Sequence, residues 1–194
     1  MSTRLIVPPV GLAVSMDAAR TAARADLRED GTSALDAEIE QAIRTYTTEA
    51  EGEMSRAVIE QVWRVTLDCF PAAPRGGPGA IPLSKSPLLQ VEHVKFYDVD
   101  GIQQVLYPQD YEADGESEPG FIVPAPGFAW PATAHRINAV EVQYRCGYGA
   151  DHTTVPDGIK GFILARVAEH FETGGKPTNE YVRRLLWPYK VYNL

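Results

Sequence analysis

Residues 140–148 alternate strictly between apolar and polar side chains, and this alternation constrains the fold more than any other feature of the sequence. A period of two places every second side chain on one face of a strand, so one face packs on a core and the other meets water. Gly147 and Gly149 end the pattern, and Pro156 opens a helical pattern a few residues later. The chain therefore changes from strand to helix at this point, after an earlier change from helix to strand.

Two segments in the first sixty residues carry apolar side chains at helical spacing. Ser15 is a candidate N-cap for the first, which we expect to end at Asp30-Gly31. Ser33 and Asp36 form an imperfect capping box for the second, which spans roughly residues 34–58 and is the longest helix that we predict. A short loop between them favours an antiparallel pair. The apolar positions are Met16, Ala19, Ala23 and Leu27, then Leu35, Ile39, Ile43, Tyr46, Ala50, Met54 and Val58.

A β-rich region follows the two helices. Asp100-Gly101 is typical of a hairpin turn, and the apolar phase slips near His93, which indicates a β-bulge. Residues 71–80 are a Gly- and Pro-rich loop, and residues 124–131 are expected to wrap over the sheet as a second loop. Five or six short antiparallel strands favour a small sandwich or an open barrel. The predicted strands cover residues 63–69, 89–96, 102–107, 121–123 and 137–148.

The sequence thus predicts an α+β fold in which a helical core receives a small antiparallel β insert. After Pro156, an amphipathic helix is expected to run to about Glu172 and to stop at Gly174-Gly175, before a short helix over 180–186 that Asn179 caps. The expected parts are an extended N-terminal arm (1–14), a helical core (15–60 and 151–175), a β-rich insert (61–150) and a C-terminal tail (176–194).

Charge and composition exclude several classes of protein. The net charge is −8 and no cluster of Lys and Arg is present, so electrostatic binding of nucleic acid is not expected. No apolar run approaches the length of a membrane helix, and we expect a soluble protein made in a cytoplasm. Cys69 and Cys146 occupy apolar positions of predicted strands, where we expect buried thiols, and the sequence leaves their pairing open.

No catalytic, cofactor or metal constellation is recognisable. The Asp98–Gly101 segment lacks the later ligands of a calcium loop, and the four histidines are scattered along the chain. We therefore expect no enzyme, no cofactor and no metal. One alternative stays open, a ligand-binding or hydrolytic β domain that uses the aromatic residues Trp63, Tyr97 and Trp130.

The aromatic C-terminal tail is the remaining feature that suggests a function. Exposed Trp and Tyr side chains reduce solubility unless something covers them, and they are also the residues that anchor interfaces. The tail either folds back on its own core or docks on a partner. Its aromatic and proline residues are Trp187, Pro188, Tyr189 and Tyr192.

Residues 12–192 resemble the head–tail connector, or adaptor, family of long-tailed phages and prophages, including the adaptors of gene transfer agents. The resemblance rests on the order and spacing of many short segments rather than on one motif. These segments are an Ala-rich first helix ending in Asp26-Leu27-Arg28, Ala57 to Trp63, Leu67 to Pro71, Ile81-Pro82-Leu83 with Pro87-Leu88, Val94 to Asp98 with Asp100-Gly101, Pro126-Gly127 with Trp130-Pro131, Val140 to Tyr144 with Gly147-Tyr148-Gly149, Val155-Pro156 with Ile159-Lys160, and Leu185 to Tyr189.

The resemblance implies a structural virion protein of the neck, made in the host cytoplasm. Members form rings, typically of twelve subunits, that lie under the portal protein, meet stopper or tail proteins, and let DNA pass through the lumen without specific binding. The resemblance leaves open whether the isolated protein is a monomer. The alternative to an adaptor is another neck or tail component, such as a stopper or a tail-terminator. By position, portal binding falls on Tyr181, Leu185, Leu186, Trp187, Tyr189 and Tyr192.

Overall fold

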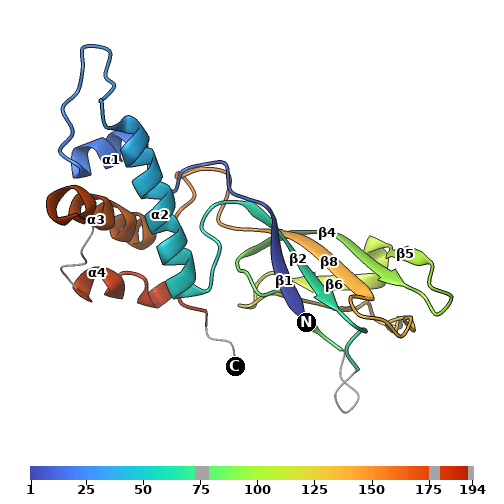
Figure 1. The fold of residues 1–194 in the computed structure, drawn as a ribbon. Helices are drawn as coiled ribbons and strands as arrows, with labels where there is room; N and C mark the ends of the chain where they lie inside the picture. Colours follow the sequence, from blue (N-terminus) through green and yellow to red (C-terminus); the bar gives the residue numbers. More distant parts are fainter. Residues whose placement is uncertain (73–78, 175–179, 192–194) are drawn as a thin grey trace. The chain divides into compact units, whose positions relative to one another are not determined.

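The computed structural model describes residues 1–72, 79–174 and 180–191, and the chain divides into two compact units (Figure 1). The β unit contains Met1–Pro8 and Gln61–Gly147, and the helical unit contains Pro9–Glu60 and Tyr148–Tyr192. The fold is α+β, as predicted. Within the described ranges, none of the helices combines the length and the apolarity needed to cross a bilayer.

The β unit holds two antiparallel sheets (Figure 1). The larger sheet has the strand order β1–β2–β8–β4–β5, with bounds Ser2–Val7, Gln61–Leu67, Val140–Cys146, Leu88–Tyr97 and Gln103–Leu106. The smaller sheet has the order β3–β7–β6, with bounds Ile81–Pro82, Phe121–Pro124 and Tyr111–Asp114. A short 3-10 helix, η2, covers Pro108–Asp110.

Strand β8 is the centre of the larger sheet and confirms the alternation seen in the sequence. Its apolar residues are buried on one face, while its polar residues are half-buried on the other. On the polar face, Glu141 pairs with Arg64 of β2 at 3.2 Å and with His93 of β4 at 2.9 Å. Polar side chains on three neighbouring strands therefore satisfy one another on this face, and the apolar face is left to form the core.

The predicted β-bulge and hairpin are both present. The register between β4 and β8 shifts between Val91 and His93. Gly101 adopts a φ of 79° in the turn between β4 and β5, and the Asp98 carboxylate accepts backbone N–H bonds from Asp100 at 3.1 Å and Ile102 at 2.9 Å. These features depend on residues close together in the chain, which is why their positions could be predicted.

The described part of the chain has eight strands, whereas the periodicity predicted five or six. Residues 1–14, predicted as an extended arm, include β1, which pairs with β2. Strands β3 and β6 were also missed, because β3 has two residues and β6 reads Tyr-Glu-Ala-Asp, a composition depleted in strand formers.

Strand β2 ends at Leu67, whereas the predicted strand extended to Cys69. The prediction that both cysteines are buried is therefore wrong for Cys69, which is exposed, and right for Cys146, and neither forms a disulfide. Part of the predicted Gly- and Pro-rich loop, residues 73–78, lies outside the described residues.

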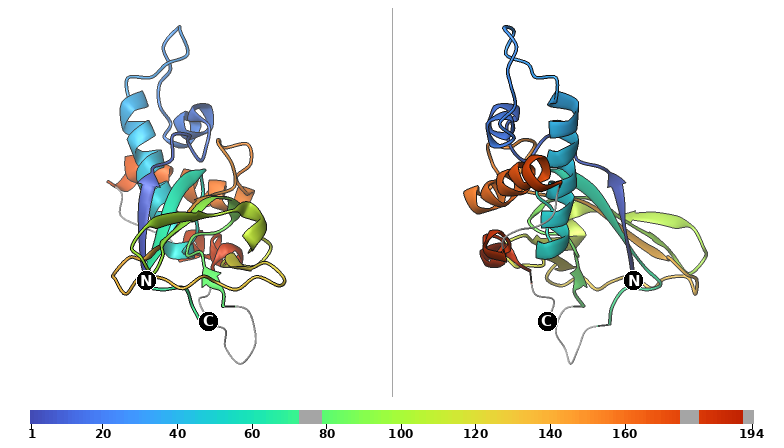
Figure 2. Two further views of the ribbon diagram at one scale, coloured as in Figure 1. Left: turned by 90° about the vertical axis from the view of Figure 1, so that its right-hand side faces the viewer. Right: turned by 60° about the vertical axis from the view of Figure 1, so that its left-hand side comes forward.

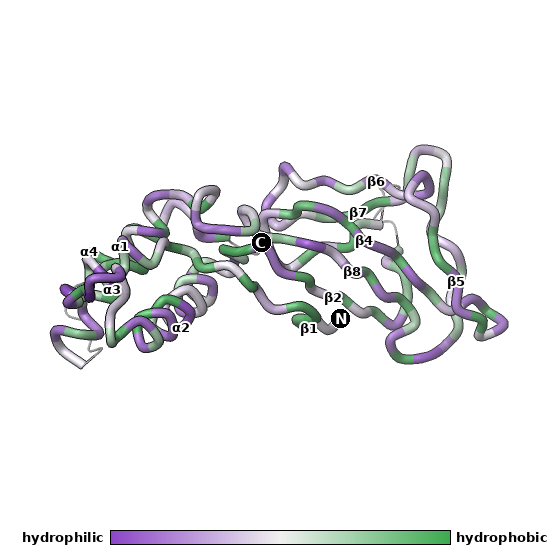
Figure 3. The backbone as a smooth tube through the Cα atoms, turned by 90° about the horizontal axis from the view of Figure 1, so that it is seen from above, coloured by the Kyte–Doolittle hydropathy of each residue, from purple (hydrophilic) through white to green (hydrophobic). Residues whose placement is uncertain are grey.

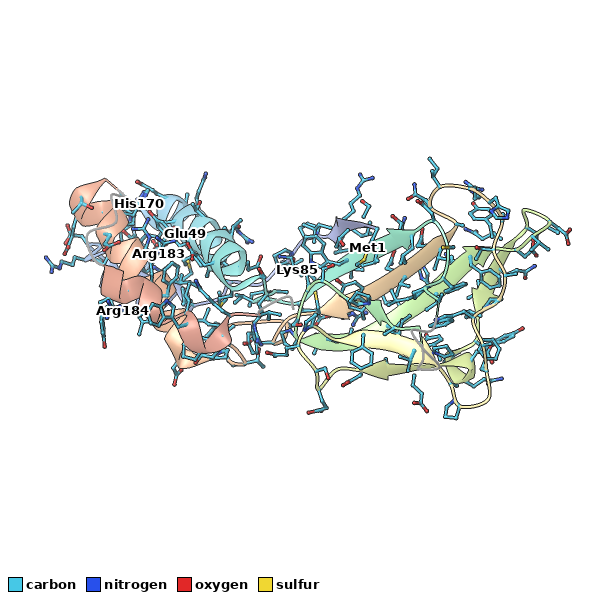
Figure 4. All side chains as sticks on the ribbon, turned by 90° about the horizontal axis from the view of Figure 1, so that it is seen from below. Met1, Glu49, Lys85, His170, Arg183 and Arg184 are labelled. Atoms are coloured by element: carbon cyan, nitrogen blue, oxygen red, sulfur yellow. The ribbon has the colours of Figure 1, made fainter. Side chains whose placement is uncertain are left out.

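The helical unit is built on α2 (Asp36–Met54) and α3 (Asp157–Thr173), which cross each other (Figure 2). The shorter helices are α1 (Met16–Ala22) and α4 (Glu180–Arg184), and Trp187–Tyr189 form a 3-10 turn, η3. One apolar cluster joins these elements, and Ile43, Phe162 and Ile163 are fully buried within it. At its edge, the hydroxyl of Tyr46 lies 3.1 Å from Nδ1 of His170, so this histidine is packed against a neighbouring helix (Figure 4).

Helix ends agree with the sequence signals in some places and not in others. Ser15 caps α1 by accepting the Ala18 N–H at 3.2 Å, and Gly174 ends α3 with a φ of 67°, both as predicted. Helix α1, however, ends at Ala22 instead of near Asp30, so the predicted short loop is wrong and residues 23–35 form the connection. Helix α2 ends at Met54 because Ser55 adopts the left-handed conformation, with a φ of 56°. The predicted cap Asn179 lies outside the described residues.

Replacing Val142 by alanine should lower the free energy of unfolding of the β unit by about 2 kcal/mol, because the position is fully buried in the central strand. Urea denaturation followed by tryptophan fluorescence measures this, since Trp63 and Trp130 both belong to that unit. The control is Ile137→Ala at a side chain that is 75% exposed in the same unit, which should change the free energy by less than about 0.5 kcal/mol. Equal losses in the two variants would contradict the placement of the core.

Candidate docking site in the C-terminal segment

Residues 181–191, called the C-terminal segment below, fold back on the core of the helical unit. Leu186 is fully buried in the apolar cluster, and Leu185 and Tyr189 are half-buried against it. Of the two possibilities that the sequence left open, the structure shows the segment docked on its own chain. Two large side chains nevertheless stay outside this contact, because Tyr181 is 65% exposed and Trp187 is 58% exposed.

The end of helix α2 provides the backbone anchors of the segment. The carbonyl of Met54 is one of the last four of the helix, which lack partners inside it, and it accepts the Val191 N–H at 2.9 Å. Arg56 follows two residues later and donates from Nε to the Tyr189 carbonyl at 2.9 Å and from Nη1 to the Tyr148 hydroxyl at 2.9 Å. Since Arg56 is only 5% exposed, these contacts also satisfy a buried cation.

Glu53, in the last turn of α2, provides an electrostatic anchor. Its carboxylate pairs with Arg183 of α4 and lies 3.4 Å from Nζ of Lys190. The hydrogen bond from Arg183 is the largest influence on this group and holds the pKa of Glu53 below its ordinary value, with a smaller contribution from Lys190. The carboxylate therefore stays charged and holds both ends of the segment.

Gly158, in the first turn of α3, allows the segment to approach closely. A Cβ at this position would lie 2.8 Å from Cε2 of Tyr189 and 3.0 Å from its hydroxyl oxygen. Three residues later, a Cβ on Gly161 would touch Leu185 at 3.6 Å. Glycine within a helix costs about 0.5–1 kcal/mol relative to alanine, and here the missing side chain makes room for the Tyr189 ring.

The outer surface of the segment is aromatic and cationic. The guanidinium of Arg184 lies 5.5 Å from the centre of the Trp187 ring, and Arg184 points away from α2 (Figure 4). Trp, Tyr and Arg are the residue types that contribute most to binding at protein interfaces. Arg184 and Trp187 therefore form an exposed pair that can contact another protein without any rearrangement, and Tyr181 is exposed in the same segment.

The predicted portal-binding residues fall into three groups. Tyr181 and Trp187 are exposed, Leu185 and Tyr189 are half-buried, and Leu186 is fully buried. Tyr192 lies outside the described residues. Sequence reasoning missed the residues that hold the segment, Glu53, Arg56 and Gly158. Only the two glycines three residues apart, at 158 and 161 in a predicted helix, offered a signal of close helix contact.

The aromatic residues of the alternative ligand site lie in separate contacts. Trp63 faces Lys85, with Nζ at 5.3 Å from the ring centre, and Tyr97 faces Arg136 at 4.0 Å. Trp130 instead stacks on Phe70 with 4.8 Å between ring centres, beside a mainly apolar cavity of ≈ 770 Å³. The described residues contain no group of three His, Cys, Asp or Glu side chains that could hold a metal ion.

Comparison with known proteins identifies solved structures of the same fold. No protein-family model matches the chain, and no curated protein matches its sequence. A chain from the neck of an empty gene transfer agent particle, solved with C6 symmetry, has a TM-score of 0.81 at 17% identity, covering 100% of this chain and 97% of that one. Chains from the virion of a native gene transfer agent particle and from its neck with C12 symmetry have TM-scores of 0.76 and 0.74 at 18% identity, with the same coverage. The whole chain therefore shares its fold with chains of these particles.

Replacing Glu53 by glutamine should loosen the C-terminal segment, because the charge that pairs with Arg183 and Lys190 is lost. Trypsin cleavage at these two residues should become about two- to fivefold faster at pH 7, in line with the modest strength of partly exposed ion pairs. The wild type should loosen in the same way as the pH falls below the ordinary glutamate pKa of about 4.3, because a carboxylate with a lowered pKa stabilises the docked form only while it is charged.

The matched control is Glu40→Gln, which removes an ion pair with Arg44 on the same helix at 2.9 Å and leaves the segment's contacts intact. Faster cleavage in both variants would show that the effect is not specific to Glu53.

Replacing Gly158 by alanine should displace the Tyr189 ring and raise the rate of cleavage at Lys190, because the added methyl group overlaps that ring. Replacing Gly52 of α2 by alanine is the control, since a Cβ there meets no atom within 4 Å. That change should stabilise the helical unit by about 0.5–1 kcal/mol. Stabilisation of the protein by both changes would show that Tyr189 is not held against α3.

Proposed function

We propose that this chain is a structural subunit of a virion neck, a head–tail connector or adaptor that forms a ring between portal and tail. The observation that carries the proposal is the likeness of the whole chain to chains of gene transfer agent necks, with 100% of this chain covered and a TM-score of 0.81. Likeness over both units supports a shared role better than likeness over one widespread domain would. The proposal includes no enzymatic activity and no cofactor.

The proposed assembly is a ring of twelve copies that continues the DNA channel. Neck structures of the similar chains have C6 and C12 symmetry, which supports cyclic assembly of this chain. The net charge of −8 suits a conduit, because an acidic wall repels the phosphate backbone and does not retain passing DNA. The protein would be made in the host cytoplasm and would act in the neck.

In the proposed contact with the portal, the C-terminal segment acts in two stages. Tyr181, Arg184 and Trp187 are exposed in the docked segment and can make the first contact. Release of the segment from Glu53 and Arg56 would then make Leu185, Leu186 and Tyr189 available as apolar anchors, with Tyr192 beyond them. Ordering a released segment on the portal costs entropy, so binding would occur only where the partner is present.

Electron microscopy of the purified protein, alone and mixed with the portal protein of the same particle, tests this proposal. We expect rings bound to the portal, and crosslinking to the portal rather than to the tail tube separates an adaptor from a stopper or tail-terminator. Monomers that never bind a portal would overturn the proposal.

Removal of residues 181–194 should abolish portal binding, and Trp187→Glu should weaken it about tenfold. The single substitution is needed because removal of the segment also uncovers the core around Leu186, whereas Trp187 is 58% exposed and its replacement should leave the fold intact. Leu27→Glu is the matched control, since Leu27 is 61% exposed in the same unit and lies outside the segment. Affinity for the portal is measured by surface plasmon resonance, and unchanged affinity after Trp187→Glu would contradict the proposed contact.

A further inference from the structure

Several of the exposed apolar side chains of the β unit lie on or beside the two edge strands of the five-stranded sheet. At one edge, Leu5 and Val7 of β1 are 37% and 46% exposed. At the other edge, four large side chains in and around the β4–β5 hairpin are 53–68% exposed, and they are Val99, Ile102, Val105 and Tyr107. Exposed apolar clusters of this kind mark interaction surfaces.

The first three residues of β5 are exposed on both faces of the strand, whereas its last residue, Leu106, is buried. Successive side chains of a strand point to opposite faces, yet Gln103, Gln104 and Val105 are all exposed. The hairpin lies at one end of the sheet, with hydrophobic and hydrophilic residues mixed along it (Figure 3). It therefore reaches beyond the packed part of the β unit.

Both edge strands offer backbone groups for further pairing. Among the described strands, β5 pairs only with β4 and β1 pairs only with β2. The Asp98 N–H donates to the Ile102 carbonyl at 3.0 Å, which makes these two residues a hydrogen-bonded pair. By the alternation of an antiparallel ladder, Gln103 and Val105 then direct their N–H and C=O groups outward. Such an edge pairs readily with another strand.

The two edges differ in charge. From Lys95 to Arg136 the chain has seven Asp and Glu residues against one Lys and one Arg, and the turn of the hairpin contributes Asp98 and Asp100 to this count. From Met1 to Met16 the chain has one charged residue, the exposed Arg4 of β1, and no carboxylate. Opposite signs favour the pairing of unlike edges over the pairing of two β5 edges, which would bring carboxylates together.

We propose that β5 of one copy pairs with β1 of a second copy of this chain, so that the five-stranded sheet continues from subunit to subunit. The contact adds a strand to an exposed sheet edge, with Leu5, Val7, Val105 and Tyr107 covering one another around it. Because this contact joins two unlike surfaces, it can repeat head to tail from one subunit to the next. The repeated contact closes into a ring when the rotation between neighbouring subunits allows closure. The closed-ring part of this inference rests on the proposed function, whereas the edge contact itself does not.

Crosslinking tests the contact directly in the full chain. In a background with the exposed Cys69 replaced by serine, Leu5→Cys and Val105→Cys are introduced together and treated with a bismaleimide whose span tolerates a shift in register. We expect a ladder of dimers and larger species, only mixed dimers when the two single variants are combined, and no product from either single variant alone. Dimers from Val105→Cys alone, or no product from the double variant at any concentration, would overturn the proposal.

Substitution tests whether the edge is needed for assembly. Val105→Lys and Leu5→Lys place a charge on each edge and should raise the concentration needed for ring formation at least tenfold, measured by mass photometry. Ile137→Lys is the control, because Ile137 is 75% exposed in the same unit but lies on neither edge strand, and it should have no effect.

The outcomes separate the two proposals. Rings that form as readily with Val105→Lys as with the wild type would overturn the edge contact and leave the neck function standing. A crosslinked ladder from a protein that never closes into rings and never binds a portal would support the edge contact and overturn the neck function.

Discussion

Burial of one face of β8 is the constraint on which the rest of the structure depends. This strand pairs along its whole length with β2 on one side and with β4 on the other. It therefore connects β2 and β4, which both come earlier in the sequence. Its continuation then enters the helical unit, where the Tyr148 N–H donates to the Val58 carbonyl at 3.1 Å and the Gly149 carbonyl accepts the Glu60 N–H at 2.8 Å. Two of the segments of the helical unit that continue into the β unit, at Glu60 and at Tyr148, are therefore hydrogen-bonded to each other.

The C-terminal segment is held by a small number of contacts. One buried leucine, two backbone carbonyls and one carboxylate provide much of the attachment, and the ion pairs of Glu53 are partly exposed. The partly exposed ion pairs add little to the cost of release, whereas uncovering Leu186 and leaving Arg56 without the Tyr189 carbonyl add more. The segment has aromatic side chains that are already exposed and leucines that are covered. This arrangement suits the proposed sequence, in which the aromatic side chains contact a partner first and the leucines then leave their own core to pack on that partner.

The two units provide different surfaces for the proposed assembly. The helical unit presents the C-terminal segment, which suits contact with a different protein such as a portal. The β unit presents two unlike sheet edges, which suit contact between copies of the same chain. A neck component needs both kinds of contact, because it must close on itself and also join the components on either side.

Local patterns in the sequence were sufficient to predict the α+β class, β8, the hairpin at Gly101, the bulge near His93, the Ser15 cap and the end of α3 at Gly174, because neighbouring residues determine these features. The sequence did not predict β1 or β6, the exposure of Cys69, or the early end of α1, because these depend on strand partners and packing far along the chain. The aromatic tail was predicted to be covered either by its own core or by a partner, but only the tertiary structure decided that Leu186 is buried and that Glu53, Arg56 and Gly158 hold the segment. Residues distant in sequence come together only when the core forms, and burial, not local pattern, then determines which side chains remain available for binding.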